Sequence, residues 1–408
     1  MICKNGVRIV LENIPTVRSV AIGVWINAGS RDETLHNNGI SHFLEHMFFK
    51  GTKTKSAKEI AESFDSIGGQ VNAFTSKEYT CYYAKVMDTH AKFALDVLAD
   101  MFFNSTFDQT ELNKEKNVVN EEIKMYEDAP DDIVHDLIAR AAFGDHSLAY
   151  PILGTEQTLN SFDSDKLKNY VRDMYTPEKV VVSVAGNITD EFMKEIESLF
   201  GEYSNTPANA DDRSVTFKPG KIARKKDTEQ AHLCLAYEGL PIGHKKAYHL
   251  TILNNILGGT MSSRLFQDVR EEKGLAYSVF SYQSIFKDTG LVTLYGGTGN
   301  AQLDELYDTM KQTVETLVEH GITEKELYNS KEQLKGGLML SLESTNSRMT
   351  RNGKNELLLN RHKSLDEMVE QIDAVTLEEV NELAKEIFGK DCAVAVINPT
   401  GTLPTRCN

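Results

Sequence analysis

Two histidines and a glutamate near the start of the sequence have the types and spacing that zinc chemistry requires. His42 and His46 are four residues apart, and Glu45 lies between them. Residues four apart lie above one another on a helix, so the imidazoles converge and the carboxylate lies on the same side. Imidazoles are common zinc ligands, and a nearby carboxylate can take a proton from an activated water. The order His-x-x-Glu-His is the signature of inverted zincins and predicts a hydrolytic zinc site.

An amphipathic helix is predicted to carry these three residues. Apolar side chains recur around them at helical spacing: Ile40, Phe43, Leu44, Met47 and Phe48. The turn residues 37–39 precede this stripe, and Lys50-Gly51-Thr52 follows it. The alternative interpretation is a solvated helix face that carries two histidines and a glutamate by chance.

A catalytic zinc site also needs a third protein ligand. The helix predicted over residues 108–127 offers Glu115 and Glu122, which are seven residues apart and therefore on nearly the same face. The pattern alone does not choose between them. Without the histidine helix, an exposed glutamate on a charged helix would be the preferred interpretation of either residue.

Composition excludes several other classes of protein. The 408 residues carry a formal charge of −16, which disfavours nucleic acid as a partner. No apolar run is long enough to span a membrane, and the alternating segment Val7–Leu11 begins where a signal peptide would lie, so we expect a cytoplasmic protein without a membrane anchor. The five cysteines are scattered without paired spacing, which disfavours a disulfide framework.

The order of predicted elements is repeated along the chain. In the first half, alternating strands, the histidine helix, a second helix, two strands and two long helices follow one another. The same order returns in the second half, with Gly259-Thr260 at the place of Gly51-Thr52. This alignment puts Leu250, Leu253 and Asn254 at the positions of the zinc-helix residues. The second copy therefore cannot bind zinc there.

We expect an α+β protein of two homologous domains, each a mostly antiparallel sheet with helices packed on one side. The predicted bounds are residues 1–205 for a catalytic zinc domain, 206–221 for a polar linker, and 222–408 for a zinc-less repeat that contributes substrate-binding residues. A peptide is most simply held by adding it to an exposed sheet edge. The strand predicted at Gln70–Thr75 is the candidate edge, although an ordinary hairpin strand is the alternative.

Over essentially its whole length the sequence resembles the pitrilysin, insulinase and mitochondrial processing peptidase family, and within it a short bacterial branch. The motifs that carry the resemblance are residues 39–52 (GISHFLEHMFFKGT), 69–75 (GQVNAFT), 118–123 (VVNEEI), 150–154 (YPILG) and 263–277 (SRLFQDVREEKGLAY). It implies that Glu122 is the third zinc ligand and that Glu115 is a supporting glutamate. A zinc-dependent endopeptidase with one Zn2+ per chain and Glu45 as general base follows from this resemblance.

The resemblance also implies how a peptide is bound. It places Asn72 and Ala73, with the neighbouring Phe74, beside the substrate backbone, and it makes Arg270 and Tyr277 contacts of the substrate carbonyl. From the sequence alone, Arg270 could be a surface ion-pair partner and Tyr277 a core residue.

The chain has half the length of the family's four-domain members, so the resemblance implies a homodimer with composite active sites that encloses peptide substrates. Two other functions are alternatives. One is a non-catalytic homologue that binds or presents peptides, and the other is a zinc hydrolase that acts on small amides.

Overall fold

The computed structural model describes residues 1–205 and 214–407, so residues 206–213 of the predicted linker lie outside the described part. Contacts divide the chain into two compact units that are not continuous in sequence. The first unit comprises Met1–Lys124, Tyr150–Asp212 and Leu340–His362, and the second comprises the remaining segments. Each unit is described by itself below.

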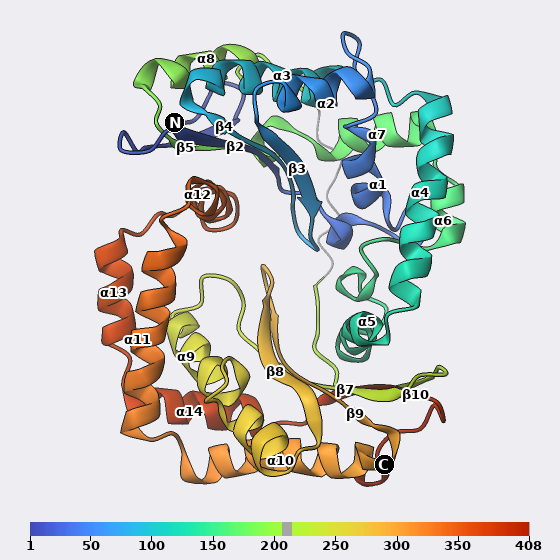
Figure 1. The fold of residues 1–408 in the computed structure, drawn as a ribbon, viewed down its shortest axis with the longest axis vertical. Helices are drawn as coiled ribbons and strands as arrows, with labels where there is room; N and C mark the ends of the chain where they lie inside the picture. The colour runs from blue at the N-terminus through green and yellow to red at the C-terminus, as the bar shows by residue number, and fades with distance from the viewer. Residues whose placement is uncertain (206–213, 408) are drawn as a thin grey trace. The chain divides into compact units, whose positions relative to one another are not determined.

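A five-stranded sheet forms the centre of the first unit, in the order β1-β5-β2-β4-β3 (Figure 1). The strands are β1 (Arg8–Asn13), β2 (Ser19–Ile26), β3 (Gln70–Thr75), β4 (Thr80–Met87) and β5 (Val180–Gly186). β1 pairs with β5 in parallel, and every other pairing in this sheet is antiparallel. β3 is an edge strand, as the sequence predicted.

The second unit has a sheet with the same connectivity, in the order β6-β10-β7-β9-β8. Its strands are β6 (Lys221–Lys225), β7 (Gln230–Glu238), β8 (Ala276–Ile285), β9 (Gly290–Gly299) and β10 (Ala393–Asn398). Again the first and last strands pair in parallel, and the other pairings are antiparallel. The matching orders confirm the predicted α+β fold with two homologous sheets.

Most helices of the first unit pack on one face of its sheet. They are α1 (Ile40–Met47), α2 (Ala57–Asp65), α3 (Ala91–Asn104), α4 (Gln109–Glu127), α6 (Glu156–Asn160), α7 (Ser164–Met174) and α8 (Asp190–Phe200). The alternation of β2 explains this, because Val20, Ile22, Val24 and Ile26 all point into the core under these helices. In the second unit, α9 (Ala247–Gly258), α10 (Leu303–His320), α11 (Glu324–Ser341) and α14 (Leu377–Phe388) contribute to a comparable core, and α13 (Leu365–Asp373) packs on α9.

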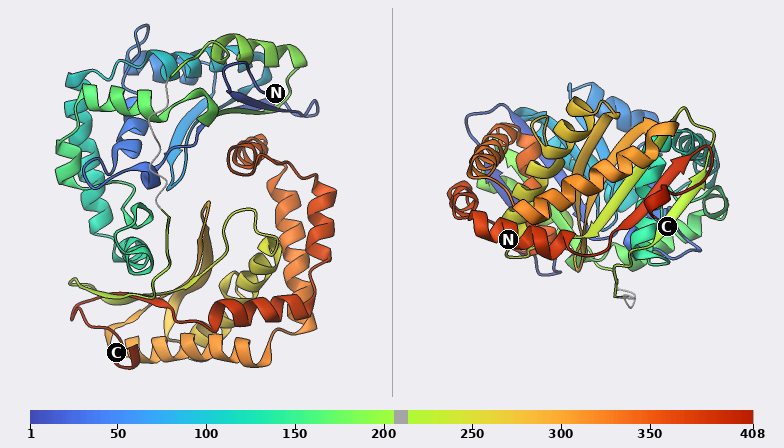
Figure 2. Two further views of the ribbon diagram at one scale, coloured as in Figure 1. Left: turned by 180° about the vertical axis from the view of Figure 1, so that it is seen from behind. Right: turned by 90° about the horizontal axis from the view of Figure 1, so that it is seen from below.

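The opposite face of each sheet is covered by a helix from the other half of the sequence. α12 (Thr345–Leu359) packs on β1, β2 and β5 of the first sheet (Figure 1, Figure 2). Trp25 of β2 is fully buried in the cluster that includes Met349 and Leu357 of α12. α5 (Pro130–Phe143) packs in the same way on β6, β7 and β10 of the second sheet. The expectation of helices on one side only is thus incomplete, because β2 and β7 are apolar on both faces and both faces need cover.

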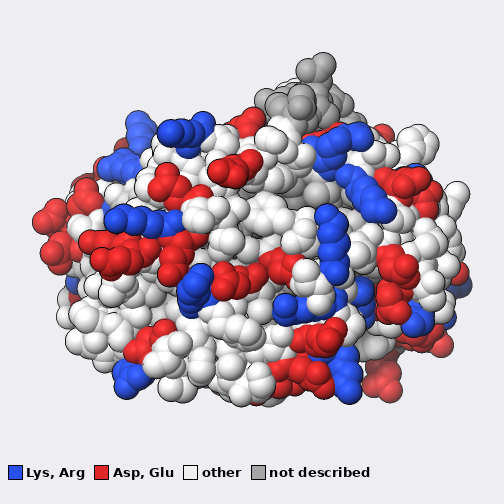
Figure 3. Space-filling view, turned by 90° about the horizontal axis from the view of Figure 1, so that it is seen from above, with Lys and Arg blue, Asp and Glu red and all other residues white. Residues whose placement is uncertain are grey.

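The described residues show mixed charges on one face of the surface and buried cysteine thiols. On the face drawn in Figure 3, Lys and Arg side chains are interspersed with Asp and Glu, so the described residues there form no large patch of one sign. All five cysteines are free and buried. Among the described residues, no helix combines the length and apolar character that crossing a membrane requires.

Candidate metal centre

α1 begins at a glycine and buries most of its own side chains. Gly39 occupies the position before the helix with φ of 91°, in the left-handed region that favours glycine. Phe43 and Leu44 are fully buried in the core of the unit. Core packing on one side of α1 leaves the other side, with His42, Glu45 and His46, to face α4 and β3.

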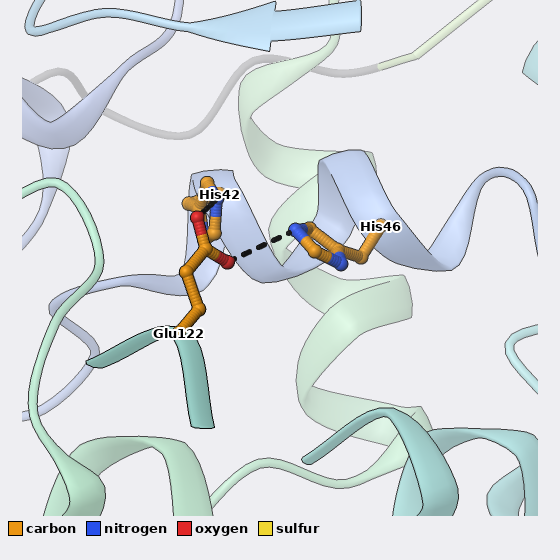
Figure 4. A group of neighbouring side chains, drawn as sticks. All are labelled: His42, His46 and Glu122. Carbon is orange, nitrogen blue, oxygen red and sulfur yellow. Dashed lines mark ion pairs between the residues drawn. The ribbon is translucent and has the colours of Figure 1, made fainter. Parts of the chain in front are cut away.

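Three potential ligand atoms converge between α1 and α4, as Figure 4 shows. One atom each from His42, His46 and Glu122 lie within 4.8 Å of one another, and they form the single metal-type cluster of three His, Cys, Asp or Glu residues in the described chain. His42 Nε2 lies 3.6 Å from Glu122 Oε1, and His46 Nε2 lies 3.5 Å from Glu122 Oε2.

These spacings fit a shared metal ion better than hydrogen bonds. An ordinary N–H···O bond is about 2.7–3.2 Å long, whereas two ligands about 2.0 Å from a tetrahedral ion are roughly 3.3 Å apart. His42 Nδ1 is buried without a hydrogen-bond partner among the described residues. Two imidazoles and one carboxylate are a donor set typical of catalytic zinc, so the residues present fit this ion.

His42 is held in its neutral form. Burial, with a smaller effect of the neighbouring His46, lowers the pKa of His42 to about 3. An imidazole must be neutral to offer a lone pair to a metal. His42 is therefore ready to bind an ion throughout the range near neutral pH.

His46 is oriented by Glu115, which the structure places behind it on α4. Glu115 Oε1 accepts a hydrogen bond from His46 Nδ1 at 2.8 Å, and Lys50 Nζ lies 2.6 Å from the other oxygen. Burial would raise the pKa of Glu115, but the bonds from His46 and Lys50 outweigh it and lower the pKa. The ionised carboxylate fixes the tautomer in which Nε2 of His46 is free to face Glu122. The same bond helps to raise the pKa of His46 although burial would lower it.

Glu45 lies beside the three converging atoms and is held by the edge strand. Thr75 on β3 donates a hydrogen bond of 2.6 Å to Glu45 Oε2. Burial raises the pKa of Glu45 above its ordinary value, although this bond partly opposes the effect. A carboxylate with a raised pKa takes up a proton more readily, which suits a general base.

The residues predicted on β3 do not share one environment. Asn72 is exposed, and its Oδ1 accepts a hydrogen bond of 2.8 Å from the N–H of Ala73, a nearly buried residue. The ring of Phe74 packs against Trp25, with ring centroids 5.5 Å apart. A pocket of about 440 Å³ adjoins this strand and is lined by Ala61, Phe64, Asp65, Gly69, Gln70, Val71, Asn72 and Tyr83.

Arg270 and Tyr277 belong to the second unit and contact each other there. The guanidinium of Arg270 lies between two aromatic rings, 4.7 Å from the centroid of Phe266 and 4.5 Å from that of Tyr277. Arg270 lies on the π-helical segment η5 (Phe266–Glu272). Tyr277 is 80% exposed, so it is not a core residue. A β-bulge in β8 at this position explains its exposure, since a bulge turns a side chain out of the strand's alternation.

The second repeat has apolar groups where the first has its metal-type cluster. Leu250 and Leu253 are buried in the core of the second unit. Asn254 donates from Nδ2 to the carbonyl of Ser281. At these positions the second repeat thus presents two buried leucines and an asparagine that is bonded to the backbone of β8.

Two residues that support the metal-type cluster, Lys50 and Thr75, are not among the residues predicted from the sequence. Lys50 neutralises Glu115, and Thr75 holds Glu45. Both lie at the ends of motifs that the sequence analysis identified, residues 39–52 and 69–75. Both are polar residues within these motifs, which is the only signal that the sequence offers for them. Their partners, Glu115 and Glu45, are seen only in the structure.

Comparisons with known proteins cover both halves of the chain. Residues 8–156 match the profile described as Insulinase (Peptidase family M16), and residues 161–334 match Peptidase M16 inactive domain. The sequence is 66% identical over 403 residues to the uncharacterized zinc protease YmxG of Bacillus subtilis, covering 99% of this chain and 98% of that protein. It is 40% identical to an uncharacterized zinc protease of Streptomyces coelicolor, covering 97% of this chain and 88% of that protein.

Solved structures share the fold at low sequence identity. A protease from Helicobacter pylori superposes with a TM-score of 0.92 at 22% identity and covers 98% of each chain. A peptidase M16 inactive domain from Pseudomonas fluorescens gives a TM-score of 0.91 at 19% identity, covering 99% of this chain and 98% of its own. At such identities the likeness concerns the fold alone.

Proposed function

Because the chain belongs to the insulinase family, peptidase family M16, we propose that it is a zinc-dependent endopeptidase that hydrolyses peptides or unfolded segments of proteins. The observation that carries the proposal is the convergence of His42, His46 and Glu122, with the carboxylate of Glu45 beside them. The relatives from Bacillus subtilis and Streptomyces coelicolor are themselves named zinc proteases.

Zinc is the cofactor in this proposal, with one ion per chain held by the two histidines and Glu122. When bound, it would act as a Lewis acid and make water acidic enough to attack a peptide carbonyl near neutral pH. Glu115 orients His46 through their hydrogen bond and is itself neutralised by Lys50.

Glu45 does the proton transfer. Its carboxylate takes a proton from the attacking water and then delivers that proton to the amine nitrogen that leaves. Thr75 donates to one oxygen of Glu45 and so leaves the other oxygen available for this exchange. The carboxylate that takes the proton from water also returns it to the leaving nitrogen. Glu45 therefore serves as both base and acid, and no second carboxylate is needed.

The substrate is a peptide in extended form, which adds to the free edge of β3 and uses the backbone of Asn72 and Ala73. The edge position of β3 and the neighbouring pocket support this role. Phe74 would support the strand from the opposite face, where its ring meets Trp25. Arg270 and Tyr277 act as donors toward substrate carbonyls, and the exposure of Tyr277 supports that role.

Zinc stoichiometry and cleavage of a mixed peptide library test the proposal together. We expect about one zinc per chain and endoproteolytic cleavage, and a Glu45→Gln variant should keep the zinc while turnover falls by roughly 10²–10⁴-fold. A chain without zinc would contradict the proposal. Zinc without peptide cleavage would favour a non-catalytic peptide-binding homologue, and cleavage of small amides alone would favour another class of hydrolase.

A further inference from the structure

A buried carboxylate outside the metal-type cluster holds the start of the helix that carries it. Glu33 is completely buried, and its two oxygens accept three hydrogen bonds. Oε2 accepts from the Gly39 N–H at 2.7 Å and from Asn38 Nδ2 at 2.9 Å, and Oε1 accepts from the Ser41 N–H at 2.9 Å. Glu33 lies outside the motifs that carry the family resemblance.

α1 needs this acceptor because it has no cap of its own. The first N–H groups of a helix lack partners within the helix, and a side chain before the helix usually accepts from them. Ser56 caps α2 and Asp163 caps α7 in this way. Gly39 has no side chain with which to cap α1. The side chain of Glu33, six residues upstream of Gly39, takes that place by accepting a hydrogen bond from the Ser41 N–H.

The backbone before α1 is also packed tightly against a neighbouring loop. A Cβ atom on Gly39 would lie 2.6 Å from the carbonyl oxygen of Leu153, and one on Gly154 would lie 2.4 Å from that of Asn38. Asn38 Nδ2 donates to the carbonyl of Pro151 as well as to Glu33. The chain therefore enters α1 along one fixed path.

Resting on the proposed function, we infer that Glu33 is a positioning residue of the metal centre: its carboxylate fixes the first turn of α1 and thereby the distance from His42 and His46 to Glu122. The helix has eight residues, and His42 directly follows the anchored Ser41. A shift of the first turn moves both imidazoles relative to α4. Metal sites tolerate displacements of only about 0.5 Å.

The test measures zinc affinity of the full-length chain by competition with a chromogenic zinc chelator. Glu33→Gln keeps the shape of the side chain but replaces one of its two acceptor oxygens with an amide NH2, which cannot accept from the N–H groups that this oxygen serves. We expect its zinc dissociation constant to rise roughly 10–100-fold, the range seen when supporting groups of metal sites are lost.

Asp88→Asn is the matched control, because Asp88 is another carboxylate of the first unit with several donors, Arg18, Asn187 and the Thr89 N–H, none of them on α1. Its zinc dissociation constant should stay within about twofold of that of the wild type. A merely structural role of Glu33 predicts equal zinc affinity in the two folded variants, which would overturn the inference.

A second variant keeps the test decisive if Glu33→Gln fails to fold. Asn38→Ala removes one donor to Glu33 and leaves both backbone bonds, so zinc affinity should fall by a smaller factor. Unchanged affinity in this variant would then overturn the inference. The proposed function fails separately: a wild-type chain that binds no zinc contradicts both, whereas a wild type with one zinc and an unchanged Glu33→Gln variant contradicts the positioning role alone.

Discussion

The two histidines of the cluster have different supporting groups. His46 Nδ1 donates to Glu115, whereas His42 Nδ1 is buried without a partner among the described residues. His42 is therefore neutral because of burial, and His46 is oriented by a carboxylate. The two carboxylates of α4 then have separable roles, since Glu122 faces both imidazoles while Glu115 contacts one of them from behind.

Replacing these carboxylates one at a time should separate the roles. Glu122→Gln removes a ligand, so we expect its zinc dissociation constant to rise by more than roughly 100-fold. Glu115→Gln removes only an orienting group, so we expect a rise of roughly 10–100-fold. Zinc affinity measured by chelator competition checks both values.

Glu121→Gln serves as the control on the same helix. Glu121 is exposed and pairs with Lys124 at 2.7 Å, away from the histidines. Its replacement should leave zinc affinity unchanged. If Glu115→Gln released zinc more easily than Glu122→Gln, the third ligand would be assigned wrongly.

The buried carboxylate of Glu33 should make stability depend on pH. Burial raises the pKa of Glu33 from 4.5 to about 7 although its hydrogen bonds lower it. Between these two pKa values the folded state binds more protons than the unfolded state. The stabilisation that Glu33 contributes is therefore complete below pH 4.5 and is lost as the pH rises through 7. The loss amounts to about 3 kcal/mol.

A comparison of the wild type with Glu33→Gln checks this sign. Other titrating groups are common to both proteins, so the difference in their unfolding free energies isolates Glu33. We expect the wild type to lose stability relative to Glu33→Gln as pH rises from 4 to 8, in denaturant unfolding of the metal-free chain. A constant difference across this range would show that the carboxylate titrates normally.

At the scale of elements, the contact between α12 and the first sheet is unusually close. Trp25 donates from Nε1 to Met349 Sδ at 3.4 Å, and Ser183 donates to the carbonyl of Met349 at 2.8 Å. Gly353 faces the indole directly, and a Cβ atom there would lie 2.4 Å from Trp25 Nε1. The indole ring of Trp25 is itself fully buried.

Gly353→Ala should therefore destabilise the first unit although the position lies in the second half of the sequence. Overpacking of a close contact costs about 1–3 kcal/mol. Hydrogen exchange of the β2 and β5 amides should become faster, and thermal unfolding should begin at a lower temperature.

Gly336→Ala is the control, since nothing lies within 4 Å of a Cβ atom at that exposed position of α11. An alanine in an open helical position should stabilise the protein by up to about 1 kcal/mol. A Gly353→Ala variant as stable as Gly336→Ala would contradict the described packing of α12.

Periodicity predicted the elements around the metal centre well. The strand at Gln70–Thr75 and the helices α1 and α4 lie where apolar spacing placed them. The exchange of α5 and α12 was not predicted, because periodicity shows that a helix has an apolar face but not which sheet that face covers.

For the candidate site too, the local sequence predicted which residues come together on one helix but not the contacts made beyond that helix. Spacing on one helix brings His42, Glu45 and His46 together, so local sequence is sufficient for them. Glu122 and Glu115 come from α4, and choosing between them required the family resemblance. Thr75 acts through a contact between β3 and α1, and Glu33 acts through a loop contact with residues five to eight positions along the chain; apolar periodicity predicts neither contact.

At the scale of the whole molecule, the duplication allows the two repeats to differ in role. The first sheet carries the metal-type cluster, and the second carries the exposed pair of Arg270 and Tyr277. We propose that two copies associate as a homodimer and that Arg270 and Tyr277 of one subunit serve the zinc of the other.

Mixing two inactive variants tests this composite arrangement. One variant is Glu45→Gln, and the other combines Arg270→Ala with Tyr277→Phe. In a mixed dimer, the site with intact Glu45 meets an intact Arg and Tyr, while the other site carries both defects. Random exchange makes about half the dimers mixed, each with one good site of two, so roughly a quarter of wild-type activity should return.

Subunit exchange must be confirmed by mass or by labelling in the same mixture. If exchange occurs and activity stays absent, the pair acts within its own subunit and the composite site is excluded. The zinc chemistry of the first unit would be unaffected by that result.

Each sheet is covered by a helix from the other half of the sequence, α12 on the first and α5 on the second, and this has a consequence for the synthesis of the chain. While a ribosome synthesises the chain, β1, β2 and β5 are complete once Gly186 has emerged, but the face around Trp25 stays bare until α12 follows at Thr345–Leu359. For more than a third of translation, an apolar sheet face therefore awaits its cover. The nascent chain presents the kind of surface that chaperones bind, and a truncated product ending before Thr345 would aggregate through it.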